Sequence, residues 1–98
     1  MTVYVDDVFI RTEPGYLGMR FGATWCHMTA DTKQELHDFA AELGLKRDWF
    51  QDKDSGHWHY DVTKTVRARA IRAGAVPIGH TLADFARVWH RPGREGVQ

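Results

Sequence analysis

Residues 57–61, which read His-Trp-His-Tyr-Asp, hold the side chains best suited to chemistry. If this segment is extended, His57, His59 and Asp61 lie on one face, because successive side chains of a strand alternate. Two imidazoles and a carboxylate on one face are suitable ligands for a divalent metal ion. Alternatively, Asp61 orients one histidine, which then acts as a general base. A third interpretation is structural, with Asp61 as the cap of a following helix.

Further ionisable residues near the ends of predicted elements extend this candidate site. Asp6 and His27 belong to neighbouring predicted strands and are candidates to complete a metal shell. His37 borders the apolar face of a predicted helix, where it can face a cleft. Arg67 follows Asp61 by about one and a half helical turns and is a candidate for positioning an anionic substrate.

Several other reactive motifs are excluded. Cys26 is the single cysteine, so no internal disulfide forms, and a small buried side chain is its favoured role. Cys26 and His27 are adjacent on a predicted strand and point to opposite faces, so they do not pair. The sequence contains neither glycine-rich phosphate-loop pattern. A calcium loop starting at Asp52 is rejected, because Thr63 stands where the closing glutamate belongs.

The charge balance limits the classes of partner. The 98 residues include 13 Lys plus Arg and 13 Asp plus Glu, so the net charge is zero. This balance excludes a protein that coats nucleic acid or an anionic membrane with its whole surface. The zero is a cancellation, because residues 1–61 carry −5 and residues 62–98 carry +5. The basic helix predicted over 63–73 suits an anion or nucleic-acid face, although a solvated helix surface is the favoured interpretation.

Apolar periodicity gives the elements that must position these side chains. It predicts strands over 2–5, 8–10, 25–28 and 76–78, with a returning hairpin arm over 17–23. It predicts helices starting at Thr32, Thr63 and Thr81, the first two ending at Gly44 and Gly74. In the last helix, Leu82, Phe85 and Trp89 share a predicted apolar face.

These elements indicate an α/β or α+β fold. We expect a single two-layer domain over 1–90, with a short mixed β-sheet covered by about three helices, and a flexible tail over 91–98. So small a sheet has free edges, and a homodimer is compatible with them. No apolar run is long enough for a membrane span, and no leader segment is recognised at the start. A cytoplasmic protein is therefore expected.

Several segments resemble a family of small bacterial and phage proteins catalogued as domain of unknown function 4031. The resemblance covers about residues 1–79 and rests on Met1 to Asp6, Ala30-Asp31-Thr32, Glu35-Leu36-His37, Trp49-Phe50 and His59-Tyr60-Asp61. It implies a short bacterial or phage protein and no established activity. It also groups Asp31 with the histidines and Asp61, as a candidate for substrate binding. His57 falls where this chain departs from the family pattern.

Together these patterns predict a small hydrolase or phosphoester-processing enzyme centred on His59 and Asp61. Supporting roles are expected for His27 and His37, and for Asp6 in substrate binding. Its ligand is expected to be a small anion, and a divalent metal ion is a candidate cofactor. The first alternative is a non-catalytic module that docks on a host protein through its tryptophans and charged halves. The second is nucleic-acid binding through the helix over 63–73.

Overall fold

The computed structural model describes residues 2–15, 22–52 and 56–96. The strands are β1(Val3–Val5), β2(Ile10–Arg11), β3(Thr24–Ala30), β4(Phe50–Gln51), β5(His59–Thr63) and β6(Val76–Pro77). The helices are α1(Lys33–Glu42), α2(Lys64–Arg72) and α3(Leu82–Asp84), with a 3-10 turn η2(Arg47–Trp49) and a π-helical turn η3(Phe85–Trp89). The predicted hairpin arm over 17–23 falls largely outside the described residues.

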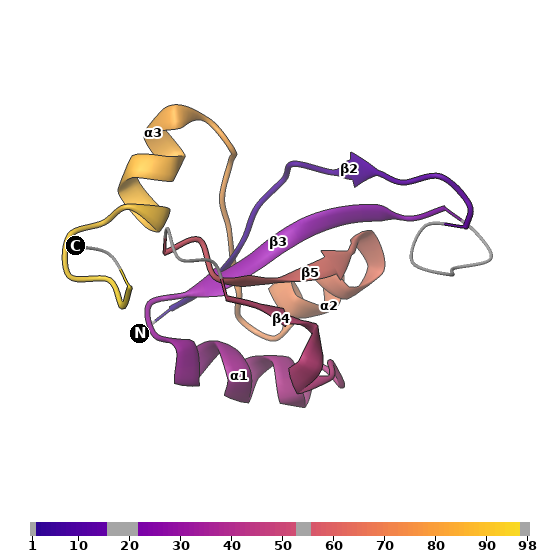
Figure 1. Ribbon diagram of the computed structural model, residues 1–98, viewed down its shortest axis with the longest axis horizontal. Coiled ribbons are helices and arrows are strands. Elements are labelled where there is room, and N and C mark those ends of the chain that lie inside the picture. The colour runs from indigo at the N-terminus through magenta and orange to yellow at the C-terminus, as the bar shows by residue number, and fades with distance from the viewer. Residues whose placement is uncertain (1, 16–21, 53–55, 97–98) are drawn as a thin grey trace.

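The six strands form one mixed sheet in the order β4-β5-β3-β1-β6, and β2 pairs with β3 beyond the end of β1 (Figure 1). The pairs of β1 with β3, of β3 with β5 and of β4 with β5 are antiparallel, whereas β6 runs parallel to β1. The predicted α+β class and mixed sheet are therefore confirmed. The proline in β6 occupies an edge strand, as expected, because an edge strand tolerates a missing N–H donor.

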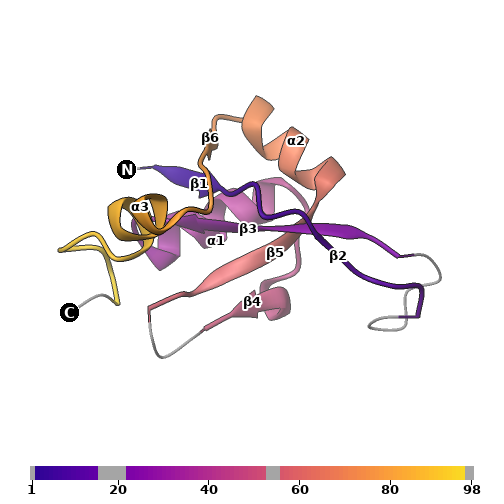
Figure 2. The same cartoon turned by 90° about the horizontal axis from the view of Figure 1, so that it is seen from above.

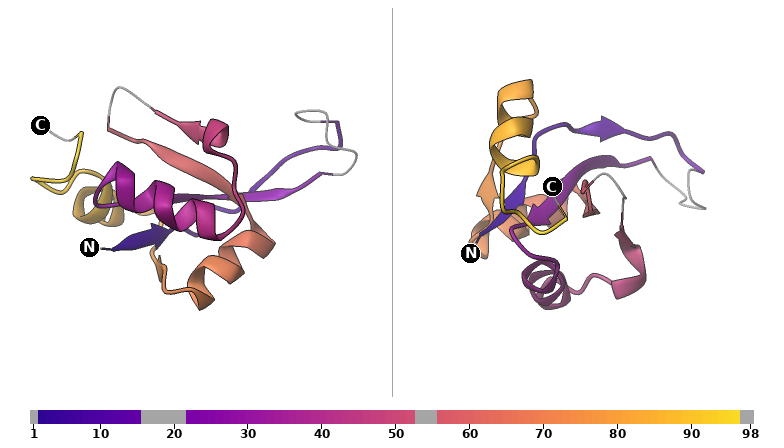
Figure 3. Two further views of the ribbon diagram at one scale, coloured as in Figure 1. Left: turned by 90° about the horizontal axis from the view of Figure 1, so that it is seen from below. Right: turned by 60° about the vertical axis from the view of Figure 1, so that its left-hand side comes forward.

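Two helices cover one face of the sheet, and their ends follow the capping signals in the sequence. Thr32 and Thr63 each accept a hydrogen bond from the backbone three residues on, at 3.2 and 3.3 Å. Gly44 and Gly74 follow the last turns with φ of 83° and 113°, a conformation that glycine adopts without strain. Figure 3 shows α1 and α2 side by side beneath the sheet. Leu36, Ala40 and Ala70 supply their buried contacts.

Side chains alternate along the strands, so one face of the sheet packs in the core. The opposite face carries the candidate site and is called the site face. Cys26 and Met28 of β3, with Tyr60 and Val62 of β5, are almost fully buried in the core against α1 and α2. Their neighbours in sequence point to the opposite face of the sheet, because the side-chain period of a strand is two. His27 is one of these neighbours, so the fold places it on the site face.

The last helical segment lies on the opposite side of the sheet from α1 (Figure 1 and Figure 2). Val88 and Trp89 of η3 are buried there with Ile78, and Tyr4 packs against them. The prediction for Leu82 is wrong, because its side chain is 89% exposed. The helix widens at Phe85 into a π-turn, in which the His90 N–H donates to the Phe85 carbonyl at 2.9 Å. This widening changes which side chains face the sheet.

The segment after η3 packs on the sheet through Arg94, which is only 2% exposed. Its guanidinium donates to the carbonyls of Ala30, Gly56 and Trp89 and to the Thr29 hydroxyl, at 2.6 to 3.3 Å. The segment predicted as a tail therefore contains a buried anchor. Across residues 2–15, 22–52 and 56–96, we find no helix with the length and apolar character needed to cross a membrane.

Candidate functional site

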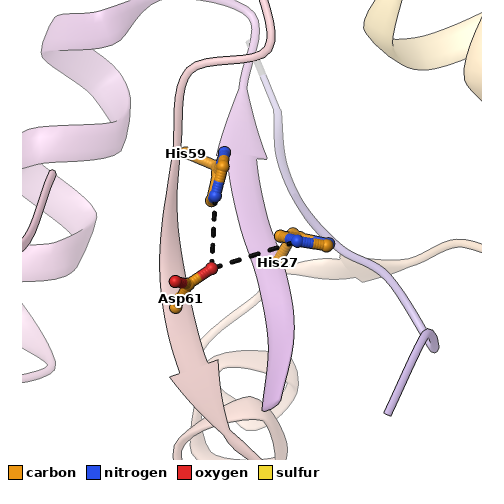
Figure 4. Close-up of side chains that lie close together, drawn as sticks. All are labelled: His27, His59 and Asp61. Carbon is orange, nitrogen blue, oxygen red and sulfur yellow. Dashed lines mark ion pairs between the residues drawn. The ribbon is translucent and has the colours of Figure 1, made fainter. Parts of the chain in front are cut away.

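His27, His59 and Asp61 converge on the site face (Figure 4). In the antiparallel pairing of β3 with β5, His27 lies directly opposite Asp61. His59 precedes Asp61 by two residues and therefore shares its face. The closest approaches to Asp61 Oδ1 are 3.2 Å from His59 Nε2 and 3.9 Å from His27 Nε2. The strand register thus brings two imidazole nitrogens to one carboxylate oxygen.

Asp6 fixes the orientation of His27 from a position just after the neighbouring strand β1. Asp6 follows β1, is 4% exposed, and its carboxylate lies 2.7 Å from His27 Nδ1. The same carboxylate accepts the His27 backbone N–H at 2.8 Å, and the Asp6 N–H donates to the His27 carbonyl at 3.0 Å. The proton of the neutral His27 ring is therefore held on Nδ1. Its Nε2 lone pair is directed toward Asp61.

His59 and Asp61 are oriented by different partners with the same result. His59 Nδ1 donates to the His57 carbonyl at 2.6 Å, so in the neutral ring Nε2 carries the lone pair. The side-chain amide of Gln51 in β4 donates to Asp61 Oδ2. This bond leaves Asp61 Oδ1 facing the two histidines. Each of the three groups is thus held by a second residue, as the ligands of metal sites commonly are.

Electrostatics favour the ionised carboxylates. Burial opposes ionisation of Asp6, but hydrogen bonds from the ring and main chain of His27 outweigh it and lower the pKa of Asp6. Burial also opposes ionisation of Asp61, but its contacts with His59, His27 and Gln51 lower its pKa. The hydrogen bond to Asp6 raises the pKa of His27 despite partial burial. In the absence of a cation, the site therefore attracts one, either a proton or a metal ion.

The two histidines of the cluster line a cavity of about 480 Å³. The sheet contributes His27 and His59, and η3 contributes Phe85 and Trp89 as an aromatic wall. The remaining lining residues come from connecting segments and are Asp6, Val8, His57, Gly79 and His80. Trp89 meets the rings of His27 and His59 edge to face, with centroids 6.2 and 6.1 Å apart. One side of the histidines is thus covered and the other faces a space that can admit a small molecule.

The three ligand atoms lie near enough to one another to share one metal ion. One nitrogen or oxygen from each of His27, His59 and Asp61 lies within 4.8 Å of the other two. Ligand atoms about 2.1 Å from a tetrahedral ion are about 3.4 Å apart, so a small closure of the cluster would accommodate the ion. Three protein ligands leave one position for water or substrate, as in catalytic zinc sites.

Comparison with known protein families shows which family the chain belongs to. The model of a family described as a protein of unknown function (DUF4031) matches residues 3–88. The chain belongs to this family. The part that matches DUF4031 includes Asp6, His27, His59 and Asp61, whereas Trp89 and Arg94 lie beyond it. No curated protein and no solved structure matches the chain significantly.

Three residues predicted for the site lie elsewhere in this DUF4031 chain. His37 Nδ1 lies 2.8 Å from the Tyr60 hydroxyl and lines a second cavity beside α1. Asp31 lines that second cavity as well, and pairs with Arg91 at 2.6 Å. Arg67 donates to the Asp6 carbonyl at 2.7 Å and stacks on Phe9, with 5.0 Å between guanidinium and ring. Arg67 thus supports the backbone that presents Asp6.

Sequence reasoning missed four residues around the cavity. Neither Gln51 nor Asp7 was predicted for the site, although Gln51 donates to Asp61 and Asp7 accepts from His80. Trp89 was expected in the core, and its position over the histidines depends on the π-turn. His80 was not considered, although it lines the cavity. A signal was present at 6–7, since two consecutive aspartates after a buried strand can orient two different histidines.

The Asp6–His27 pair makes the stability of the metal-free DUF4031 protein depend on pH. Folding raises the pKa of His27 above its ordinary value of 6.5. The contribution of this pair to the stability of the folded protein is therefore complete below pH 6.5 and is lost as the pH rises through the raised pKa of His27. The lowered pKa of Asp6 preserves the stabilisation above 3.8 and removes it at lower pH. We expect the melting temperature of chelator-treated protein to fall by about 5 °C between about pH 6 and about pH 9.

Asp6→Asn is the matched variant for these thermal melts. The amide preserves the shape of the side chain but cannot form an ion pair with the imidazolium, so the fall in melting temperature with pH should be smaller than in the wild type. An equally large fall in Asp6→Asn would show that other groups cause the pH dependence.

Proposed function

We propose that this protein is a small metal-dependent hydrolase of phosphoesters. His27 Nε2, His59 Nε2 and Asp61 Oδ1 bind one divalent ion. The observation that supports the proposal best is the occupation of both Nδ1 atoms by fixed acceptors, Asp6 and the His57 carbonyl. Both Nε2 lone pairs are thereby directed to the same carboxylate oxygen, as in carboxylate–histidine–metal arrangements.

The donor set favours zinc among the common divalent ions. Two imidazole nitrogens and one carboxylate oxygen match the His/Asp/Glu sets of catalytic zinc sites. A site for magnesium or calcium would instead offer mainly oxygen atoms. His27 and His59 line the cavity, so zinc held by these residues would lower the pKa of a bound water there and would supply a nucleophile near neutral pH.

The cavity favours an anionic substrate of modest size. Four imidazoles line it, from His27, His57, His59 and His80. The hydrogen bond that His80 donates to the Asp7 carboxylate raises the pKa of His80 and so favours its cationic form. A metal ion adds two positive charges beside them. A phosphoester would place its charged oxygens against the ion and its organic group against Phe85 and Trp89.

The alternative functions gain less support from the structure. Of the four cations of α2, Arg67 and Arg69 donate to the backbone carbonyls of Asp6 and Leu43, which reduces the charge available for nucleic-acid binding. Docking on a host protein and homodimer formation are compatible with the cavity. A cytoplasmic location and a bacterial or phage origin are part of the proposal, on the basis of the single cysteine and the family resemblance.

Two measurements on the wild-type chain test the proposal. In isothermal titration calorimetry, chelator-treated protein should bind about one Zn²⁺ per chain and release protons. The loaded protein should hydrolyse bis(p-nitrophenyl) phosphate faster than the same concentration of free Zn²⁺. Absence of zinc binding would overturn the metal site. Zinc binding without hydrolysis above the free ion would overturn the enzymatic part.

A further inference from the structure

We propose that His80, oriented by Asp7, is the general acid that protonates the leaving group in this cavity. The inference rests on the proposed hydrolytic function and adds a catalytic residue to it. His80 lines the same cavity as His27 and His59 but comes from the segment between β6 and α3. The metal ligands and His80 thus approach a bound substrate from different elements.

Consecutive aspartates orient the two kinds of histidine. Asp6 holds His27 Nδ1 at 2.7 Å, and Asp7 Oδ1 holds His80 Nδ1 at 2.5 Å. With Nδ1–H donated to Asp7, His80 has Nε2 left to meet a substrate in the cavity. The His80 and Asp7 side chains are 60% and 43% exposed, so both water and substrate reach them. This geometry is that of an acid–base histidine with an orienting carboxylate.

The backbone on both sides of His80 is fixed. On one side, buried Ile78 donates its N–H to the Val5 carbonyl at 2.8 Å, which ties the segment to β1 just before Asp6 and Asp7. On the other side, Thr81 and Asp84 form a reciprocal capping box at the start of α3. His80 therefore stands between two anchored points.

Gly79 permits this close arrangement. A Cβ at Gly79 would lie 2.5 Å from Asp84 Oδ2, the oxygen that accepts the Thr81 N–H. A side chain at position 79 would therefore displace the Asp84 carboxylate or the backbone next to His80. The absence of a side chain keeps the capping box and the histidine side by side.

The charges around His80 favour its protonated form. The hydrogen bond and the charge of Asp7 raise the pKa of His80, and the carboxylates of Asp6 and Asp84 act in the same direction. Three more imidazoles, those of His27, His57 and His59, face the cavity. Near neutral pH, His80 can therefore hold a proton on Nε2 and give it to a developing alkoxide.

A water activated at the His27–His59–Asp61 site gives one proton to solvent, and its oxygen forms the new P–O bond. The electron pair of the breaking P–O bond moves to the leaving oxygen. That oxygen takes the proton from Nε2 of the His80 imidazolium, and solvent later returns a proton to the ring. The products are an alcohol and a phosphate with one ester bond fewer.

The general-acid role is tested by comparing two phosphodiesters as substrates of the zinc-loaded protein. p-Nitrophenolate leaves without protonation, whereas an alkoxide needs an acid. His80→Gln should therefore reduce kcat about 100-fold for an alkyl diester and only slightly for bis(p-nitrophenyl) phosphate. The decline of kcat on the basic side of the pH profile should disappear in His80→Gln. In Asp7→Asn it should move to lower pH, because the carboxylate that raises the pKa is gone.

Zinc affinity and an NMR titration keep the two proposals separate. Both variants should bind Zn²⁺ like the wild type, since neither changes a ligand. The imidazole signals of His80 should titrate at lower pH in Asp7→Asn. Equal losses for the two substrates, or an unchanged pH profile in His80→Gln, would overturn the general-acid role and leave the metal site standing. A wild type that neither binds zinc nor hydrolyses either ester would overturn both.

Discussion

His59→Asn is expected to weaken zinc binding about 100-fold. Asparagine places its amide nitrogen near the position of Nδ1, so it can still donate to the His57 carbonyl, but it has no counterpart of Nε2. The variant thus removes one metal ligand while preserving the local hydrogen bond. Structural zinc sites gain about 3 kcal/mol or more per ligand, which corresponds to at least about a hundredfold in affinity. Competition with a fluorescent zinc chelator measures the change.

His37→Asn is the matched control. His37 makes a comparable Nδ1 contact, with the Tyr60 hydroxyl, but lines the second cavity. The same substitution there should leave zinc affinity within about twofold of the wild type. The visible spectrum of bound Co²⁺ provides a second readout, because its intensity and position report four-coordinate geometry. Equal zinc affinity in His59→Asn and the wild type would rule out His59 as a ligand. A large loss in His37→Asn would instead implicate the second cavity.

The sequence alone was sufficient to place His59 and Asp61 on the same face of a strand, because side-chain direction in a strand repeats every two residues. Their pairing with His27 depends on the register between β3 and β5, which is set by tertiary packing and by the connection through α1. The sequence therefore identified candidate groups without fixing which of them meet. His37 illustrates the limit, since the cavity that it lines depends on which face of the sheet α1 covers.

The helix starts were predictable because the hydroxyls of Thr32, Thr63 and Thr81 each accept a hydrogen bond from the backbone N–H three residues later. The π-turn was not, since its wider hydrogen bonds are stabilised by the packing of Val88 and Trp89 against the sheet. The roles of Asp7 and His80 were equally hidden. These residues are 73 positions apart and meet only after β6 pairs with β1.

The C-terminal segment shows why composition alone misleads. Residues 91–96 have no apolar periodicity, which is typical of a solvated tail. Arg94 nevertheless lies between two tryptophans, with its guanidinium 4.0 Å from the ring of Trp58 and 5.5 Å from that of Trp89. The hydrogen bonds of the Arg94 guanidinium hold this segment in place, a role that buried apolar side chains usually fill. A single charged side chain thus fixes a segment that pattern analysis assigns to solvent.

Arg94→Met is expected to destabilise the protein by about 3 kcal/mol. Methionine fills a similar volume but donates no hydrogen bond, so the carbonyls of Ala30, Gly56 and Trp89 lose their donor. Each buried acceptor left without a partner costs about 1 kcal/mol or more. Gly56 precedes His57 and Trp89 covers His27, so zinc affinity should also fall. Urea unfolding of the metal-free protein measures the first effect, and zinc titration measures the second.

Arg91→Met makes the same chemical change three residues earlier. Arg91 is 45% exposed and pairs with Asp31 on the surface, so its loss should cost less than about 1 kcal/mol. The difference between the two variants isolates the buried hydrogen bonds from the loss of one positive charge. If Arg94→Met unfolds at the same urea concentration as Arg91→Met, the packing of residues 91–96 does not contribute to stability. The cavity wall at Trp89 would then have to be held by η3 alone.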